Sequence, residues 1–199
     1  DKEVYKIPML LLIGWRGEPS LKDEPQHIKQ GKVTTNILDS IGVKWFIVGP
    51  ETRNPIGVFA KALRLMDLSE SPVAVIVKKN TFETYQLLNK GEKEFLLLRE
   101  EALEIILDNL SENSIIVSTT GMTSREIFEY RESRGQPHFR DFLTVGSMGH
   151  TSSIAFGLSL AQPAKKIICI DGDGSMLMHL GAVAIQGVSE RDNFFHILI

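Results

Sequence analysis

The segment Gly172-Asp173-Gly174-Ser175 combines residue types that suit a metal–phosphate group. Glycines let a backbone approach phosphate oxygens closely, and the free amides at a helix start favour anions. Asp173 offers the carboxylate oxygen that Mg²⁺ prefers. The segment follows an apolar run ending at Asp171 and precedes an expected helix over 176–188. Taken alone, these four residues are explained equally well as a tight turn between a strand and a helix.

Two further glycine-containing turns favour a binding site. Gly146-Ser147-Met148-Gly149 begins 26 positions before Gly172 and is followed by His150 and an expected helix over 152–160. Thr119-Thr120-Gly121 follows an expected strand over 115–117. In a parallel sheet, turns that follow strands lie at one carboxyl edge, where ligands bind. The three turns therefore predict a single site at that edge.

Other ligand-binding motifs do not fit this sequence. A dinucleotide fingerprint needs a third glycine where Leu177 stands. A Walker A loop needs Gly-Lys-Ser/Thr, and Gly31-Lys32 is followed by Val33. The lone cysteine, Cys169, and the scattered histidines give no zinc-ligand spacing.

The elements that must position these turns alternate between short apolar runs and segments of helical period, which predicts an α/β fold with a parallel sheet flanked by helices. Besides the run that ends at Asp171, the expected strands are 8–13, 45–48, 73–77, 115–117, 142–145 and 194–199. The expected helices are 34–41, 56–68, 101–110, 125–131 with Ser124 as its cap, 152–160 and 176–188. The loop before residue 34 contains His27.

The chain is expected to comprise parts of two domains. Residues 79–99 are polar and are interpreted as a linker between residues 1–78 and 100–199. The first residue is not Met, and the last strand-like run stops at Ile199, so we expect a piece of a longer protein.

Composition excludes several classes of protein. A net charge of −3 over 199 residues gives no basic face for nucleic acid. One cysteine excludes a disulfide framework and indicates a reducing, cytoplasmic location. No apolar stretch approaches the length of a membrane span.

The glycine turns also resemble a known family. Gly172-Asp173-Gly174 resembles the signature of thiamine diphosphate enzymes, in which Asn follows about two dozen residues later; here that Asn would fall at or just past position 200. Gly146-Ser147-Met148-Gly149 is similar to the turn that holds the aminopyrimidine and props the cofactor into a bent shape. The resemblance implies that thiamine diphosphate and Mg²⁺ bind here, with Asp173 as a metal ligand. The implied cofactor-binding residues are Thr119, Thr120, Gly121, Gly146, Ser147, Met148, Gly149, Gly172, Asp173, Gly174 and Ser175. Without its flanking glycines, Met148 would be interpreted as core packing.

Residues 11–19 and 22–31 resemble phosphonopyruvate decarboxylases and the related sulfopyruvate decarboxylases. This implies that residues 1–78 end a pyrimidine-binding domain and that 100–199 are a diphosphate-binding domain truncated at its C-terminal side. The implied reaction is non-oxidative decarboxylation of 3-phosphonopyruvate to phosphonoacetaldehyde and CO₂. The alternatives are decarboxylation of 3-sulfopyruvate and a non-catalytic thiamine diphosphate-binding fragment completed by another chain.

The resemblance also implies a 2-oxo acid substrate and a site formed between domains of two subunits, in at least a homodimer. The catalytic Glu of the family would precede residue 1, so we expect the 199 residues alone to be inactive. His150 and Met148, with His27, are the candidate catalytic residues. His150 is interpreted as a cofactor or substrate contact, or equally as a solvent-facing side chain. His27, with Arg16 and Lys29 nearby, is a candidate for contacting the phosphonate, or else part of a solvated loop. His179 and His196 are expected to pack inside a helix and a strand.

Overall fold

A computed structural model describes residues 3–86 and 96–199, and each of these two ranges belongs to a compact unit of its own. Both are built from parallel strands flanked by helices, so the expected α/β fold is confirmed. Each unit is described by itself.

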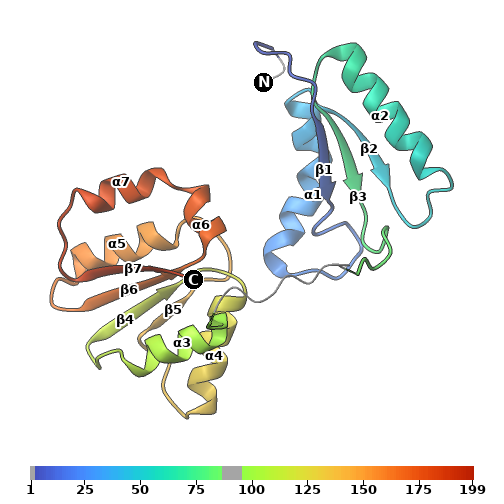
Figure 1. Cartoon of the computed structure of the whole chain (residues 1–199). Coiled ribbons are helices and arrows are strands. Elements are labelled where there is room, and N and C mark those ends of the chain that lie inside the picture. Colours follow the sequence, from blue (N-terminus) through green and yellow to red (C-terminus); the bar gives the residue numbers. More distant parts are fainter. Residues whose placement is uncertain (1–2, 87–95) are drawn as a thin grey trace. The chain divides into compact units, whose positions relative to one another are not determined.

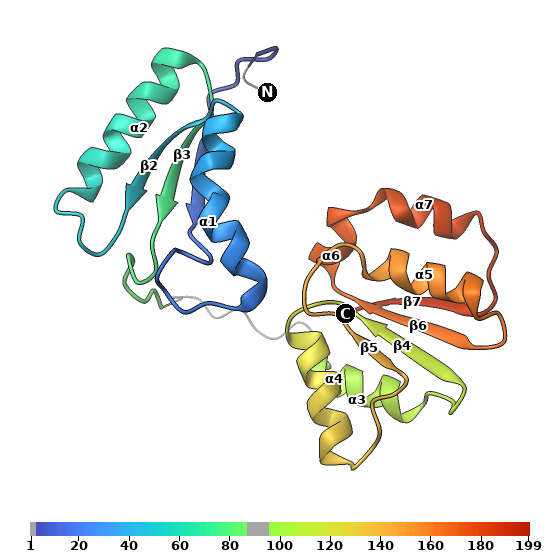
Figure 2. The same cartoon turned by 180° about the vertical axis from the view of Figure 1, so that it is seen from behind.

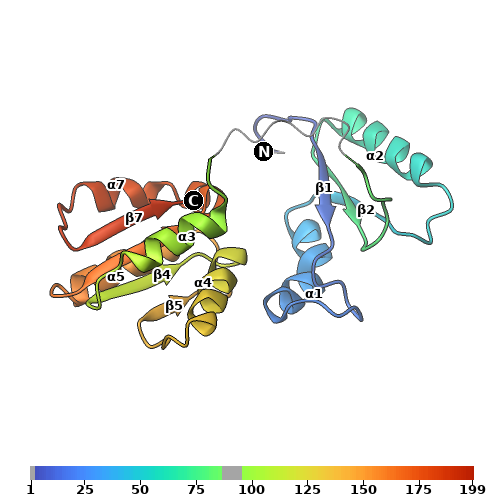
Figure 3. The ribbon, with the colours of Figure 1, turned by 60° about the horizontal axis from the view of Figure 1, so that its bottom comes forward.

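The N-terminal unit has a three-stranded parallel sheet in the order β1-β3-β2. Its strands are β1 (Leu10–Gly14), β2 (Lys44–Val48) and β3 (Val73–Val77). Helix α1 (Pro25–Ser40) covers one face and α2 (Pro55–Ser69) covers the other (Figures 1 and 2). The arrows of β1 and β2 point the same way in Figure 3, and each strand pairs with β3.

The central strand β3 supplies the core of this unit, because all five of its residues are buried. Val73 and Val75 pack with Ala62 of α2, whereas Ala74 and Ile76 pack with Leu38 of α1. Alternate residues of a strand point to opposite faces, so an unbroken apolar run is what a strand covered on both sides requires.

Helix α1 begins at Pro25, so the prediction of a helix starting at residue 34 was wrong. Proline suits the first helical position because its missing N–H would have no partner there. Gly31 obscured the pattern: a Cβ at this position would lie 1.8 Å from the Gly17 carbonyl oxygen. The helix therefore packs directly on the loop after β1, and His27 lies in the first helical turn rather than in a loop.

The C-terminal unit has a four-stranded parallel sheet in the order β5-β4-β6-β7. Its strands are β4 (Ser114–Ser118), β5 (Asp141–Leu143), β6 (Lys166–Asp171) and β7 (Phe194–Leu198). Its helices are α3 (Arg99–Asp108), α4 (Met122–Ser133), α5 (Thr151–Ala161), α6 (Asp173–Met178) and α7 (Gly181–Gly187).

The two faces of this sheet are covered by different helices (Figures 1 and 2). On one face, Leu103 of α3 and Ile127 of α4 pack with Ile168 and Ile170 of β6. On the other face, Ala155 of α5 packs with Ile167 and Cys169 of β6 and with Val117 of β4. Both faces of β6 are therefore buried, and so is its last residue, Asp171.

Two predicted features of this unit were wrong. The single helix expected over 176–188 is broken into α6 and α7, because His179 leaves the helical region with φ −136° and ψ 41°. Ser124 does not cap a helix: it lies inside α4, and its hydroxyl donates to the Thr119 carbonyl at 2.7 Å. The N-cap position belongs to Gly121, whose φ of 104° suits glycine.

Of the expected linker over 79–99, residues 87–95 lie outside the described residues, and α3 already begins at Arg99. In the described part of the chain, no helix combines the length and apolar character needed to cross a membrane.

Candidate functional site

The three glycine-containing turns lie at one edge of the C-terminal sheet. The strands β4, β5 and β6 run parallel. Strands β4 and β6 end at Ser118 and Asp171, directly before their turns, and β5 ends at Leu143, three residues before Gly146. The Thr119 amide donates to the Ile170 carbonyl at 2.8 Å, which carries the β4–β6 pairing into the turns. A Cβ on Gly172 would lie 3.9 Å from the Thr119 side chain. The first and third turns are thus neighbours.

A hydrogen bond joins the second turn to the third. The backbone amide of Gly149 donates to the buried Ser175 hydroxyl at 3.1 Å. Gly149 has a φ of 92°, and a Cβ there would lie 2.9 Å from Cβ of Met178. Position 149 therefore requires glycine for its backbone conformation and for its close approach to α6.

Asp171 anchors the start of the third turn from inside the sheet. Its side chain is almost fully buried, and its Oδ1 accepts from the Gly172 amide at 3.0 Å. His196 Nε2 of β7 lies 3.4 Å from Oδ2. Burial raises the pKa of Asp171, but hydrogen bonds from His196, Ser175 and the Gly172 amide outweigh it, so the pKa lies below its ordinary value. Asp171 is therefore a buried carboxylate that holds its charge through hydrogen bonds.

The exposed part of the third turn has donors and space that fit a metal–diphosphate group. Asp173 is exposed, and its Oδ1 accepts from the Gly174 amide at 2.6 Å, leaving Oδ2 for a cation. A Cβ placed on Gly121 or Gly174 would meet no atom within 4 Å. The edge is therefore open where a phosphate would approach, and the hard oxygen donor that Mg²⁺ prefers stands beside it.

Met148 and His150 extend from the second turn. Met148 is 45% exposed, which disfavours the interpretation of this residue as core packing. His150 is exposed, and its ring lies 4.6 Å from that of His179 in an edge-on arrangement. The expectation that His179 packs inside a helix was wrong, because the helix breaks there and the side chain is exposed.

Cys169, Asp171 and His196 have potential ligand atoms within 4.8 Å of one another, a grouping that sequence spacing did not indicate. Burial, and secondarily the charge of Asp171, raises the pKa of the Cys169 thiol far above its ordinary value. A metal binds the thiolate, so this grouping is explained better as packing around Asp171. Asp171 was not predicted as a site residue, although its position directly before Gly172 was a usable signal.

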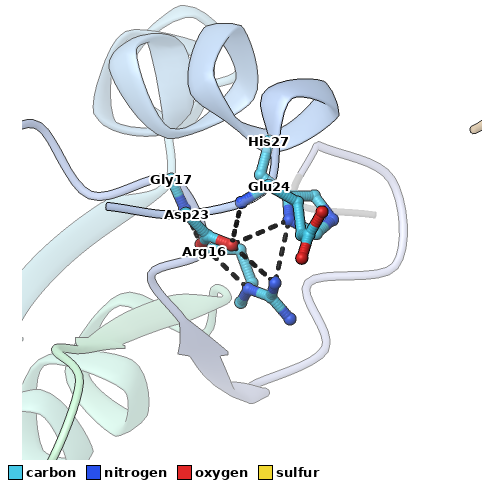
Figure 4. Close-up of polar contacts among 5 residues, drawn as sticks. All are labelled: Arg16, Gly17, Asp23, Glu24 and His27. Atoms are coloured by element: carbon cyan, nitrogen blue, oxygen red, sulfur yellow. Dashed lines mark hydrogen bonds and ion pairs between the residues drawn. The ribbon is translucent and has the colours of Figure 1, made fainter. Parts of the chain in front are cut away.

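A polar cluster follows β1 in the N-terminal unit (Figure 4). Arg16 Nε donates to Asp23 Oδ2 at 3.0 Å, and Arg16 Nη2 to Asp23 Oδ1 at 2.6 Å. His27 Nδ1 lies 3.1 Å from Asp23 Oδ1 and 2.9 Å from Arg16 Nη2. Arg16, then the amides of Gly17 and Glu24, hold the pKa of Asp23 far below its ordinary value. The cluster fixes Arg16 through a charged fork and brings His27 against it, whereas Lys29 is simply exposed.

Comparison with known proteins agrees with this geometry. Residues 119–199 match the family model described as thiamine pyrophosphate enzyme, C-terminal TPP binding domain. The chain is 29% identical to phosphonopyruvate decarboxylase of Streptomyces viridochromogenes over an alignment of 209 residues, which covers 98% of this chain and 51% of the relative. The corresponding enzyme of Streptomyces hygroscopicus gives 29% identity, with 98% of this chain and 51% of the relative covered.

Sulfopyruvate decarboxylase subunit beta of Methanocaldococcus jannaschii is 38% identical over 101 residues, covering 51% of this chain and 50% of the relative. The chain spans about half the length of the curated relatives named here. The resemblance found in the sequence motifs is confirmed by these matches.

Proposed function

We propose, from the relationship of this chain to the phosphonopyruvate decarboxylases within the thiamine diphosphate enzymes, that the protein containing it decarboxylates 3-phosphonopyruvate. The products are phosphonoacetaldehyde and CO₂, and no redox step is required. The observation that carries the proposal is the meeting of three glycine-containing turns at one sheet edge, joined by the hydrogen bond between Gly149 and Ser175.

Different residues of the C-terminal unit would bind different parts of the cofactor. Thiamine diphosphate, when bound, supplies the electron sink for decarboxylation. The Ser175 amide lies in the first turn of α6, where a diphosphate would accept a hydrogen bond. The Gly172 and Gly174 amides already donate to Asp171 and Asp173, so these glycines would contribute by letting the diphosphate approach the backbone closely. Thr119, Thr120 and Gly121 form the neighbouring wall.

Asp173 would hold Mg²⁺ against the diphosphate through its exposed carboxylate. Met148 would press on the cofactor from the second turn; its exposure and apolar character suit a residue that shapes a ligand without competing for hydrogen bonds. Gly146, Ser147 and Gly149 would present that side chain, and His150 would contact the cofactor or substrate at the end of the same turn.

Calorimetric titration of the full-length protein with thiamine diphosphate, with and without Mg²⁺, tests the cofactor assignment. We expect binding that requires Mg²⁺ and is lost in Asp173→Ala. Binding of ATP or NAD in place of thiamine diphosphate would overturn the proposal, because these ligands need other loop geometries.

Decarboxylation of 3-sulfopyruvate is the second candidate, because a sulfopyruvate decarboxylase subunit matches half of this chain at 38% identity. Comparing kcat/KM for the two substrates with the full-length protein separates the candidates. Because that relative is named as a subunit, a third candidate is a thiamine diphosphate-binding chain that another chain completes.

We further propose that the whole protein acts as a homo-oligomer in the cytoplasm, with the site formed between a pyrimidine-binding and a diphosphate-binding domain. Under this proposal residues 1–78 and 100–199 belong to those two domains, and the 199 residues alone are inactive. Turnover of phosphonopyruvate by the isolated chain would refute the last point.

A further inference from the structure

A cleft of about 470 Å³ lies at the carboxyl ends of β1 and β3 in the N-terminal unit. It begins at Gly14 and Val77, the last residues of these strands. The charged residues that line it are Arg16, Glu18, Lys22, Asp23, Lys78 and Lys79. Four cations thus face two carboxylates, which is the balance of a site that attracts an anion.

Glu18 is the unusual member of this lining. Its side chain is only 10% exposed, and its Oε1 lies 3.3 Å from Lys78 Nζ. Its other oxygen, Oε2, is buried and has no hydrogen-bond partner within residues 3–86 and 96–199. A buried carboxylate oxygen without a donor is costly, so this position favours a ligand that brings a donor of its own.

The surrounding charges are already arranged around this oxygen. Lys78 is shared between Glu18 and Glu51, with the Glu51 contact at 2.7 Å. Arg16 is held by Asp23 through Nε and Nη2, and His27 lies behind that pair rather than on the lining of the cleft. Lys22 and Lys79 are exposed on the lining. An incoming group must therefore be anionic toward the cations and yet donate one hydrogen bond to Glu18.

A phosphonate monoanion meets both demands, because it carries acceptor oxygens and one P–OH group. A sulfonate is fully ionised near neutral pH, carries no O–H, and would place its oxygens against Glu18 Oε2, the carboxylate oxygen that has no donor among the described residues. Resting on the proposed decarboxylase function, we propose that Glu18 selects phosphonate over sulfonate by accepting a hydrogen bond from the P–OH group. The cations of the cleft hold the remaining phosphonate oxygens, and Arg16 is positioned for this by Asp23 and His27.

The test is Glu18→Gln in the full-length protein, with kcat/KM measured for 3-phosphonopyruvate and 3-sulfopyruvate. Glutamine keeps the shape, removes the charge and offers an N–H to a sulfonate oxygen. We expect the ratio of kcat/KM for phosphonopyruvate to that for sulfopyruvate to fall by about 10- to 100-fold. Because any loss of folded enzyme lowers both activities equally, the ratio reports on recognition alone.

Glu51→Gln is the matched control. It removes the other carboxylate partner of Lys78, but Glu51 is 63% exposed and is outside the lining of the cleft. We expect its substrate ratio to match that of the wild type. An unchanged ratio in Glu18→Gln, or an equal change in both variants, would overturn the inference.

The pH dependence gives an independent readout. For the wild type, kcat/KM for phosphonopyruvate should fall as pH rises through the second ionisation of the phosphonate. The value of kcat/KM for sulfopyruvate should show no such fall, because a sulfonate has no second ionisation. In Glu18→Gln the fall in kcat/KM for phosphonopyruvate with rising pH should be smaller, because glutamine does not repel the phosphonate dianion. If the wild type turns over phosphonopyruvate and the fall in kcat/KM is the same in Glu18→Gln, the role of Glu18 is refuted and the proposed function is not. A wild type that turns over neither substrate refutes the proposed function as well.

Discussion

Replacing Ser175 with alanine removes the hydroxyl that joins two of the three turns at the candidate site. The Ser175 side chain is almost fully buried; its oxygen accepts from the Gly149 amide, and its hydroxyl donates to Asp171. Alanine fits the same space but can do neither. The substitution therefore tests whether the hydrogen bonds, rather than packing, hold the turns together.

The expected magnitude follows from the two broken contacts. A buried amide left without an acceptor costs about 1–3 kcal/mol. A hydrogen bond to a charged group contributes about 1.5–3 kcal/mol, although Asp171 keeps the Gly172 amide and His196 in this variant. Because the carboxylate retains these partners, we expect a loss in the free energy of unfolding of about 2–4 kcal/mol, below the sum of the two upper values.

Equilibrium unfolding in guanidinium chloride, followed by circular dichroism, measures this loss in the cofactor-free full-length protein. Ser153→Ala is the control, because Ser153 is an exposed serine of α5, and its substitution should change the free energy of unfolding by less than about 0.5 kcal/mol. If Ser175→Ala is as mild as Ser153→Ala, the hydrogen-bonded connection between the turns is not a stabilising feature and the reasoning fails.

Three further outcomes are expected. Asp173→Ala should leave cofactor-free stability within about 0.5 kcal/mol of the wild type, because the side chain is exposed, while a magnesium titration should detect loss of metal-dependent thiamine diphosphate binding; retained binding contradicts the ligand role. Gly149→Ala should cost at least about 1 kcal/mol of unfolding free energy from its positive φ and its contact with Met178, whereas Gly157→Ala, in an open position of α5, should stabilise by up to about 1 kcal/mol; equal effects would show that the turn has no such constraint. Asp171→Asn should be less stable than the wild type at neutral pH. Since the folded-state pKa of Asp171 is depressed below 3.8, its stabilisation is complete above that pH and is lost as pH falls through the folded value, so the difference between the two proteins should narrow in acid unfolding experiments.

The strands were predictable because burial on both faces leaves a direct mark in the sequence. The expected strand over 73–77 coincides with β3, since every one of its side chains must be apolar. The position of the three turns at one edge followed from the same pattern, because parallel strands place their carboxyl ends together.

The errors lie where tertiary contacts override local pattern. Glycine has a low helix propensity, so Gly31 does not favour a helix by itself. The close approach of α1 to Gly17 nevertheless requires glycine at this position. The helix breaks at His179, between α6 and α7, and this position holds neither the proline nor the glycine that would predict a break. Asp171 looked like the end of a strand, and only the structure shows that Ser175 and His196 converge on it from later segments.

The order β1-β3-β2 has a consequence for how the N-terminal sheet is assembled during synthesis. Among the described residues, β1 and β2 each pair with β3 and not with one another, with Leu10 and Lys44 both opposite Val73. Until β3 has left the ribosome, the pairings that join β1 and β2 through it cannot form. Once Val73–Val77 has emerged, β1 and β2 can both pair with it. A pause in translation just before this segment would therefore prolong the interval in which a chaperone could bind the incomplete sheet.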